Sequence, residues 1–586
     1  MLAGERIGSI LVVDCGTVMT KAMLLDRIDG EYRFVASGES PTTYDSPTSN
    51  IIDGIQHAVE QISAVTGRQF FDHSGLLISP QTTSQRGVDA LTVTVSAIEP
   101  LQMVVSGLVE DLSISSAKRA AAGTYSEVRA VLDAGEGMPH ADEERVRAIR
   151  AATPDVVCLT GGIDGGAKRP VLDAVKAATL ACALMDRGKR PTLLYAGNAH
   201  LRRQVAEIVG EEAELRVVDN VRPTHADERL LEAQQELQSI FTQRKMRSIP
   251  GLDLLTDWSP APIAPTAQAF GQLLRYLWHL GDPARGVVGI DVGGANTSVG
   301  AVFDEQLFMT INGGLGVAFG GERLLEEQGL EAIARWLPEP VPLHEVRALL
   351  INKRMHPATI PQVDSELRVE QALACAAIQT TLETARPGWQ AGDARLRRDL
   401  TPLCDTILVS GAPLTRTPRP GQAALTVINA LQPIGVSTVV LDTYGLAPAL
   451  GSVAAVKPLA AVEALDAGVF TNLATVVTPV GGEAKPGEEI LDVRATYANG
   501  SKLEVEVRYG DLEVLALPLE QEAVLELRPK RGFDVGLGGR GEAGKRRVSG
   551  GLAGLIIDAR GRPLSFPSDD QRCHERMMQW LFDVGG

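Results

Sequence analysis

The strongest constraint on this chain is a short apolar and acidic pattern that occurs twice, far apart. Residues 10–26 read ILVVDCGTVMTKAMLLD: an apolar run that ends in Asp14, a turn around Gly16 and a second apolar run. Residues 286–304, GVVGIDVGGANTSVGAVFD, repeat the design with Asp291 and Gly293. Each copy predicts a buried strand, a tight polar turn and a returning strand. Two copies in one chain indicate a duplicated fold that grips one ligand.

The composition of these turns favours phosphate as part of that ligand. Glycine lets a backbone approach a ligand closely, and N–H groups and hydroxyls can hold phosphate oxygens. Asp14 and Asp291 suit a hydrated Mg²⁺ ion, which prefers one or two carboxylates together with waters and phosphate oxygens. The candidate phosphate contacts are Gly16, Thr17, Thr20 and Lys21 in the first copy, and Gly293, Gly294, Asn296 and Thr297 in the second. Lys21 has an alternative, which is to point along its strand into solvent.

Overall composition excludes several other classes of protein. With 586 residues the chain is long enough for about three or four domains, and its formal charge of −17 argues against broad binding of nucleic acid or anionic membranes. The six cysteines have no metal-ligand spacing, so we expect a reducing cytosol without structural disulfides. The first apolar run is too short for a signal peptide, and no run reaches the ~20 residues of a membrane span. These features predict a soluble cytoplasmic protein.

The first half of the chain predicts a mixed region followed by a parallel sheet. Residues 32–36 predict a third antiparallel strand and residues 50–66 a helix. Residues 70–150 resemble an insertion, with a strand at 90–95 and helices at 101–122 and 142–152. From residue 154 on, strands alternate with helices up to residue 218, which indicates a parallel sheet with right-handed crossovers. Its loop at 161–166 contains Gly162 and Asp164, at the carboxyl end of a strand, where such sheets bind ligands.

The second half contains the second repeat and a final β-rich region. A polar helix at 226–247 and a proline-rich connection at 250–265 precede the repeat, and helices at 321–337 and 366–385 follow it. The strand at 406–409 ends in Ser410 and Gly411, where the backbone would approach an adenosine group. Residues 442–451 predict a loop that opens onto a closely packed helix of small residues. Beyond residue 470, alternating residues and an Asn499-Gly500 turn predict a β-sandwich or β-barrel with a helix at 574–582.

Each of these features also has a simpler explanation. A single Asp-x-Gly-Thr sequence is usually only a turn, and it is the repeat that favours nucleotide binding. Asp164 is either a turn former or a carboxylate in the cleft. Asp442 is better explained as a helix N-terminal anion. The sequence has no HExxH-type histidine pair, no Gly-x-Ser elbow and no P-loop, so metalloenzyme, hydrolase and P-loop chemistry are unsupported.

Taken together, these motifs resemble a known family. The turns at 14–21 and 291–298 and the Ser410 loop resemble the phosphate and adenosine motifs of the actin, sugar-kinase and heat-shock-chaperone superfamily. More narrowly, the sequences LTGGIDGG at 159–166, YAGN at 195–198 and PALG at 448–451 resemble the glutamate mutase L family. Its members are encoded beside adenosylcobalamin-dependent carbon-skeleton mutases. The resemblance covers about residues 8–460.

The resemblance implies an α/β fold with two actin-like (RNase H-like) lobes around a nucleotide cleft, to which a C-terminal all-β domain is added. The expected domains are lobe I at 1–280, with the insertion at about 70–150, lobe II at 281–469 and the β domain at 470–586. The implied ligands are ATP or ADP and Mg²⁺, and the implied role is a chaperone or reactivating ATPase for a cobalamin mutase. The candidate catalytic residues are Asp291 and Asp164, the latter to position water.

Two departures from the superfamily pattern bear on activity. Ser298 stands where the pattern usually has Asp, and Asn296 stands where a hydroxyl residue is common. Loss of that carboxylate weakens metal positioning or hydrolysis without abolishing nucleotide binding, so we expect slow turnover. Two alternatives stay open: a small-molecule kinase of the same superfamily, and an actin-like scaffold or filament protein with little catalysis. Homo-oligomer formation is also left open.

Overall fold

The computed structural model describes residues 7–44, 49–133, 142–259, 261–389, 400–567 and 570–586. By their contacts, the residues separate into two compact units. The first unit contains residues 1–97, 253–309 and 314–586, and the second contains residues 98–252 and 310–313. The domain limits expected at residues 280 and 469 stay predictions.

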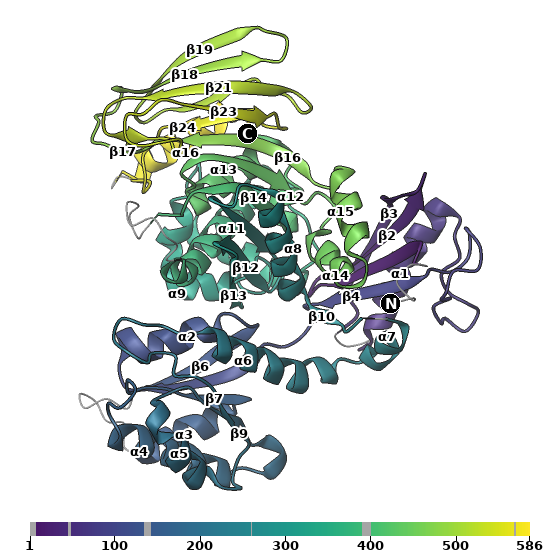
Figure 1. Ribbon diagram of the computed structural model, residues 1–586, viewed down its shortest axis with the longest axis vertical. Helices are drawn as coiled ribbons and strands as arrows, with labels where there is room; N and C mark the ends of the chain where they lie inside the picture. Colours follow the sequence, from purple (N-terminus) through teal and green to yellow (C-terminus); the bar gives the residue numbers. More distant parts are fainter. Residues whose placement is uncertain (1–6, 45–48, 134–141, 260, 390–399, 568–569) are drawn as a thin grey trace. The chain divides into compact units, whose positions relative to one another are not determined.

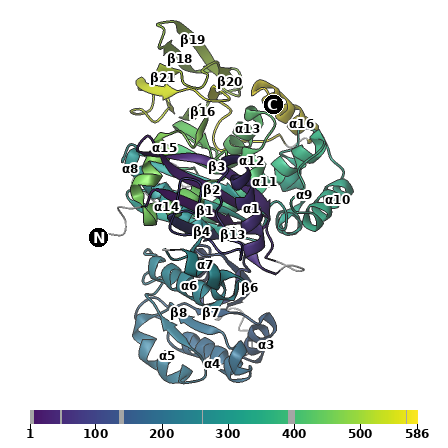
Figure 2. The ribbon, with the colours of Figure 1, turned by 90° about the vertical axis from the view of Figure 1, so that its right-hand side faces the viewer.

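The first repeat lies in a five-stranded sheet of the first unit, which Figure 2 shows with α1 in front of it. Its order is β10-β4-β1-β2-β3, with β1 antiparallel to β2, β2 antiparallel to β3, and β1 parallel to β4. The predicted hairpin and its third strand are therefore confirmed. The elements are β1 (Ser9–Cys15), β2 (Met19–Ile28), β3 (Glu31–Pro41), α1 (Ile51–Thr66), β4 (Ala90–Val95) and β10 (Ala264–Pro265).

The second repeat lies in an eight-stranded sheet of order β13-β12-β11-β14-β15-β16-β24-β20. β11 is antiparallel to β12 and parallel to β14, which is parallel to β15. The fold is thus mixed α/β, with parallel strands beside the hairpin in both sheets. The strands are β11 (Gly286–Val292), β12 (Asn296–Phe303), β13 (Gln306–Gly313), β14 (Cys404–Ser410), β15 (Gly435–Leu441), β16 (Thr471–Thr478), β20 (Leu512–Leu515) and β24 (Leu555–Asp558).

Helices α8 and α14 lie between these two sheets. They pack on each other, and α8 contacts β11 and β12 while α14 contacts β1 and β4. Side chains from both sheets and both helices share one apolar core, which includes Val12, Phe270, Leu408 and Leu450. The helices of this unit are α7 (Leu252–Trp258), α8 (Thr266–Leu280), α9 (Gly321–Ala334), α10 (Leu343–Met355), α11 (Asp364–Ala385), α12 (Ala412–Thr415), α13 (Pro420–Leu431), α14 (Ala447–Val456), α15 (Pro458–Asp466) and α16 (Asp570–Asp583).

The strands after residue 470 divide among three sheets. β16, β24 and β20 extend the second sheet, whereas the others form a four-stranded sheet of order β19-β18-β21-β23 and a short β17–β22 pair (Figure 1). Gly500, with φ of +83°, lies in the turn between β18 and β19, as the Asn-Gly signal predicts. The elements are β17 (Val480–Gly481), β18 (Glu489–Tyr497), β19 (Lys502–Arg508), β21 (Glu522–Pro529), β22 (Phe533–Asp534) and β23 (Gly544–Ser549).

The second unit is built around a five-stranded parallel sheet of order β6-β5-β7-β8-β9. Figure 1 shows α3, α4 and α5 on one side of this sheet and α2 and α6 on the other. This is a doubly wound arrangement, which confirms the predicted parallel sheet. The elements are β5 (Leu101–Gly107), α2 (Ser115–Ala121), β6 (Ser126–Asp133), α3 (Asp142–Ala152), β7 (Val156–Leu159), α4 (Arg169–Ala183), β8 (Thr192–Tyr195), α5 (Arg202–Val209), β9 (Leu215–Val217) and α6 (Leu231–Arg244).

Two local predictions were wrong. Residues 101–107, expected in a helix, form β5, whose Met103, Val104 and Val105 are fully buried. A central parallel strand is buried on both faces, so its apolar run lacks the alternation that distinguishes a strand from a helix. The proline-rich connection at 250–265 contains the helix α7. No helix in the described part of the chain is long and apolar enough to cross a membrane.

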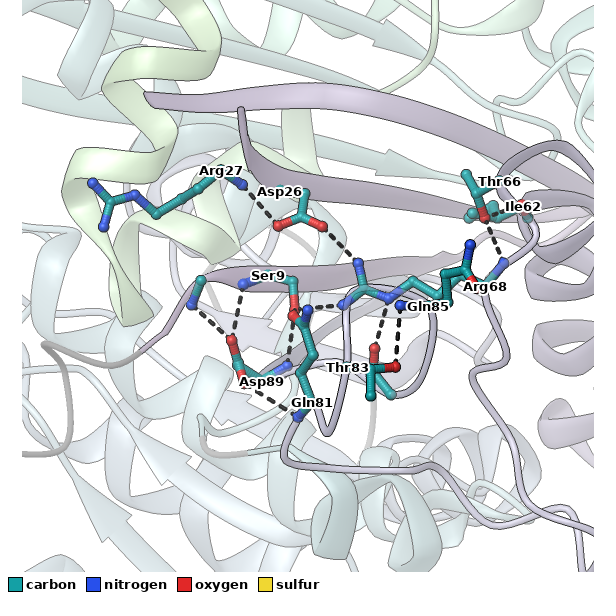
Figure 3. A network of polar contacts seen from close by, with 12 residues as sticks. Ser9, Asp26, Arg27, Ile62, Thr66, Arg68, Gln81, Thr83, Gln85 and Asp89 are labelled. Carbon is teal, nitrogen blue, oxygen red and sulfur yellow. Dashed lines mark hydrogen bonds and ion pairs between the residues drawn. The ribbon is translucent and has the colours of Figure 1, made fainter. Parts of the chain in front are cut away.

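A buried arginine anchors the long loop after α1 to the start of the first hairpin (Figure 3). The Arg68 side chain is 3% exposed and donates to Asp26 Oδ2 at 2.6 Å, to Ser9 Oγ at 2.9 Å and to the Gly87 carbonyl at 2.7 Å. Asp89 accepts hydrogen bonds from the backbone N–H groups of Gly8 and Ser9 nearby. The network therefore fixes the end of β1 opposite to Asp14.

We expect Arg68→Met to lower the free energy of unfolding by about 3 kcal/mol, because it removes a buried cation and leaves the half-buried Asp26 carboxylate and the Gly87 carbonyl without this donor. Chemical denaturation measures this change. The matched control is Arg33→Met, which removes an exposed pair with Glu31 in the same sheet and should cost less than about 1 kcal/mol. Equal losses in the two variants would contradict a structural role for the Arg68 network.

Candidate functional site

The two repeated turns have the same backbone design. Gly16 N–H donates to the Met19 carbonyl at 3.1 Å, and Gly293 N–H donates to the Asn296 carbonyl at 2.9 Å. Across each hairpin, Asp14 is paired with Lys21 and Asp291 with Ser298. A Cβ atom on Gly16 would lie 2.7 Å from the Met19 carbonyl oxygen, so this turn requires glycine.

In the first turn, two backbone carbonyl groups accept hydrogen bonds from Thr42. Thr42, which follows β3, donates its N–H to the Val18 carbonyl at 2.9 Å and its hydroxyl to the Gly16 carbonyl at 2.6 Å. Among the described residues, the N–H groups of Thr17 and Val18 have no hydrogen-bond partner. The turn therefore has backbone donors available to an anion.

The second turn likewise has bonded carbonyl groups and N–H groups without a partner, but its hydrogen-bond donors are different residues. Ala318 and Phe319 both donate to the Gly294 carbonyl at 2.9 Å, and Gly314 donates to the Ala295 carbonyl at 2.9 Å. The N–H groups of Gly294 and Ala295 have no partner within the described part of the chain. In both turns, carbonyl groups accept hydrogen bonds from the protein while two adjacent N–H groups stay available to a ligand.

The two turns meet inside the first unit. A Cβ atom on Gly294 would lie 2.3 Å from Cγ2 of Val18, so only glycine allows the second turn to approach the first this closely. The available donors of both turns consequently lie in one region.

Asp14 is oriented by two hydroxyl groups. Thr94 of β4 donates to Asp14 Oδ1 at 2.7 Å, and Thr266, the first residue of α8, donates to the same oxygen at 2.8 Å. Both donors are buried and Asp14 is half-buried. Because Oδ1 is held in this way, Oδ2 is the oxygen that is better placed to bind a cation.

Asp291 lies in an acidic environment around Lys21. Burial and the charges of Asp14 and Asp442 raise the pKa of Asp291, whereas the Lys21 ammonium and the Ser410 hydroxyl oppose the increase. The net result is a pKa of about 6. Three carboxyl groups thus surround one lysine. A bound cation would stabilise this site, because it would reduce the repulsion among the carboxylates and between them and a phosphate.

Asp442 is the N-terminal anion of α14, as the simpler explanation predicts. Its carboxylate is fully buried and accepts hydrogen bonds from Leu446 N–H at 2.6 Å, Ala447 N–H at 2.9 Å and Ser410 Oγ at 2.9 Å. Burial raises the pKa of Asp442 although these bonds oppose it. Ser410 therefore connects the end of β14 to the start of α14.

Several predicted contact residues have protein partners. Thr20 and Thr297 are fully buried, and their hydroxyls bond to Thr42 Oγ1 at 3.0 Å and to the Leu315 carbonyl at 2.8 Å. Gly411, with φ of +98°, lies so close to β11 that a Cβ atom would be 2.1 Å from the Val292 carbonyl oxygen. This packing accounts for the glycine independently of any ligand. The half-buried side chains of Thr17 and Asn296 have no hydrogen bond to another described residue.

Asp164 and Gly162 belong to the second unit, and their described contacts stay within it. Asp164 Oδ1 accepts hydrogen bonds from Ala199 N–H at 2.8 Å and Asn220 Nδ2 at 2.9 Å. Burial raises the pKa of Asp164, but these bonds and the nearby His200 and Arg202 outweigh it and hold the pKa below its usual value. Asp164 thus connects the loops at the carboxyl ends of β7, β8 and β9 as a stable carboxylate.

Sequence reasoning missed the three threonines that support the first turn. Thr94 and Thr266 are 80 and 252 residues from Asp14, and Thr42 is 26 residues from Gly16. Thr266 had one local signal, since it follows Pro265 at the start of a helix. Nothing local identified Thr94, which lies in an alternating Thr-Val strand.

Comparison with known proteins identifies one matching family. A family model described as "MutL protein" matches residues 10–469. The Protein MutL of Clostridium tetanomorphum is 25% identical over 393 residues, which cover 64% of this chain and 78% of that protein. A nucleotide-free structure of acetone carboxylase aligns with 86% of this chain and 81% of its own, at 12% sequence identity and a TM-score of 0.34. Xylulose kinase from Bifidobacterium adolescentis gives 14% identity, coverages of 79% and 94%, and a TM-score of 0.27.

The raised pKa of Asp291 predicts a pH-dependent stability difference. The folded state holds this proton more tightly than the unfolded chain, so the contribution favours folding below about pH 4 and is lost as the pH rises to about 6. Without added metal, Asp291→Asn should therefore gain stability over the wild type across this interval, by at most about 3 kcal/mol. Chemical denaturation at pH 4 and pH 7 tests this, with the exposed Asp304→Asn as the control. A constant difference for Asp291→Asn would contradict the prediction.

Proposed function

Because this chain belongs to the MutL protein family, the glutamate mutase L family, we propose that it is an actin-like ATP-binding protein that assists an adenosylcobalamin-dependent mutase. In this proposal the two sheets of the first unit belong to two lobes around a nucleotide cleft. ATP or ADP binds where the two turns meet, and nucleotide binding is coupled to the handling of the partner.

The observation that carries nucleotide binding is the pairing of the turns. Each turn directs its carbonyls into protein hydrogen bonds and leaves two adjacent N–H groups available, and Val18 contacts Gly294 between them. Consecutive backbone N–H groups in a turn form a concave binding site for anions. Two such sites side by side suit the successive phosphates of a nucleotide better than a single phosphate.

Mg²⁺ fits the acidic groups at this position. No group of three His, Cys, Asp or Glu side chains that could hold a metal ion lies within the described residues, so waters and phosphate oxygens would supply most of the ligands of an ion bound here. Asp14 and Asp291 would hold it. When bound, the ion would neutralise the carboxylates and the phosphates of the nucleotide, which otherwise repel one another.

The chain's own groups support slow hydrolysis at most. Lys21 supplies a positive charge opposite Asp14, while the equivalent position opposite Asp291 is the buried Ser298. The second turn thus lacks the additional carboxylate of the superfamily pattern. The lowered pKa of Asp164 makes it a weak proton acceptor, so it gives no particular support to the kinase alternative. The scaffold alternative would show as nucleotide-dependent sedimentation of the pure protein.

We expect MgATP to bind the purified protein, and Asp14→Asn to weaken that binding about tenfold or more. Asn retains an oxygen for Thr94 and Thr266, so the change removes charge without removing these hydrogen bonds. Calorimetry with and without Mg²⁺ measures the affinity. The exposed Asp304→Asn, in the turn between β12 and β13, should bind as the wild type does. Absence of nucleotide binding by the wild type would contradict the proposal.

The partner is tested by affinity purification of the tagged protein from its native host, with MgATP, with MgADP and without nucleotide. Mass spectrometry should identify a cobalamin-dependent mutase whose recovery depends on the nucleotide. Asp14→Asn should lose this dependence because it cannot bind the nucleotide normally. If no mutase is recovered under any condition, the accessory role fails even if ATP binds.

A further inference from the structure

The loop between β15 and α14 lies against the lysine of the first turn. This loop begins with the buried Asp442, continues through the exposed Tyr444 and reaches Gly445, whose N–H donates to the Asp442 carbonyl at 3.1 Å. Gly445 has φ of +69°, a left-handed conformation that favours glycine. Gly445 follows β15 of the eight-stranded sheet, whereas Lys21 is on β2 of the five-stranded sheet.

The end of the Lys21 side chain occupies the space that a side chain at residue 445 would need. A Cβ atom on Gly445 would lie 2.0 Å from Lys21 Nζ, 3.0 Å from Cε and 3.1 Å from Cδ. The ammonium group therefore lies directly against the Gly445 backbone. No other glycine among the described residues is in such close contact with a lysine.

The charges around Lys21 show why its position matters. Its ammonium lies within electrostatic reach of Asp291 and Asp442, yet it forms no ion pair with a described residue. A lysine side chain is a flexible four-carbon stem with a compact charge. Because no direct ion pair holds the ammonium, its position depends on the packing of the side chain as well as on attraction by these two carboxylates.

We propose that Gly445 is a positioning residue for Lys21: the absence of a side chain at residue 445 keeps the ammonium at the nucleotide site. The loop between β15 and α14 thereby positions the Lys21 ammonium, which belongs to β2 of the other sheet. This inference deepens the proposed function, since it rests on Lys21 contacting a phosphate of the bound nucleotide. In this role Gly445 acts through Lys21 and does not itself contact the nucleotide.

The test separates the effect on Lys21 from backbone strain. Gly445→Ala introduces the Cβ atom and also strains the positive φ. Gly468→Ala imposes similar strain, at φ of +79°, where a Cβ atom would meet nothing within 4 Å. A second variant, Gly445→Asn, introduces the Cβ atom with a residue that tolerates the left-handed region. Thermal unfolding verifies that each variant folds.

The first readout is MgATP affinity by calorimetry in both Lys21 and Lys21→Met backgrounds. We expect Gly445→Ala and Gly445→Asn to weaken binding about tenfold in the Lys21 background and not at all in the Lys21→Met background. Gly468→Ala should bind as the wild type does in both. Wild-type affinity in the Gly445 variants, or an equal loss in the two backgrounds, would overturn the inference.

The second readout needs no nucleotide. Reductive ¹³C-methylation of the lysines gives an NMR resonance for Lys21, which is assigned by its loss in Lys21→Met. This resonance should shift in both Gly445 variants and stay unchanged in Gly468→Ala. An unchanged resonance would overturn the inference even if ATP binds. If the resonance shifts but the wild type binds no nucleotide, the proposed function fails while Gly445 still positions Lys21.

Discussion

The first unit depends on one close contact between two helices. Gly451 of α14 lies against the backbone of α8 so tightly that a Cβ atom would be 1.9 Å from the Ala269 carbonyl oxygen. This contact holds together the helix pair that separates the two sheets. Because Thr266 at the start of α8 orients Asp14, and Asp442 caps α14, the acidic groups of both sheets are attached to the same helix pair.

The two repeats share a backbone but differ in chemistry. Position for position, Lys21 opposite Asp14 corresponds to Ser298 opposite Asp291. The first turn thus has a positive charge where the second has a buried hydroxyl. A duplicated frame with only one lysine suits a ligand whose two ends differ. The second copy differs from the first in another way, because burial raises the pKa of Asp291.

The parts of this protein that could be predicted from sequence are those determined by neighbours in the chain. The hairpins follow from apolar runs on either side of glycine turns, and the role of Asp442 follows from its place just before a helix. The small residues of α14 correctly predicted close packing, which the Gly451 contact explains. By contrast, the hydroxyls that orient Asp14 come from distant segments, and the buried strand β5 has no alternation to distinguish it from a helix. The Gly162 loop was predicted to join the nucleotide site because it follows a strand of a parallel sheet, a local feature that does not show which unit it belongs to; its described contacts lie in the second unit.

The second sheet is completed by strands that lie beyond the end of the family match. The match to the family model ends at residue 469, yet β16 begins at Thr471 and pairs along the full length of β15, followed by β24 and β20. The hydrogen-bonded sheet therefore crosses the limit of the family's recognisable sequence. β16 covers an edge of β15 that would otherwise expose unpaired backbone N–H and C=O groups, so the residues after 469 complete the second sheet and are not a detachable appendage.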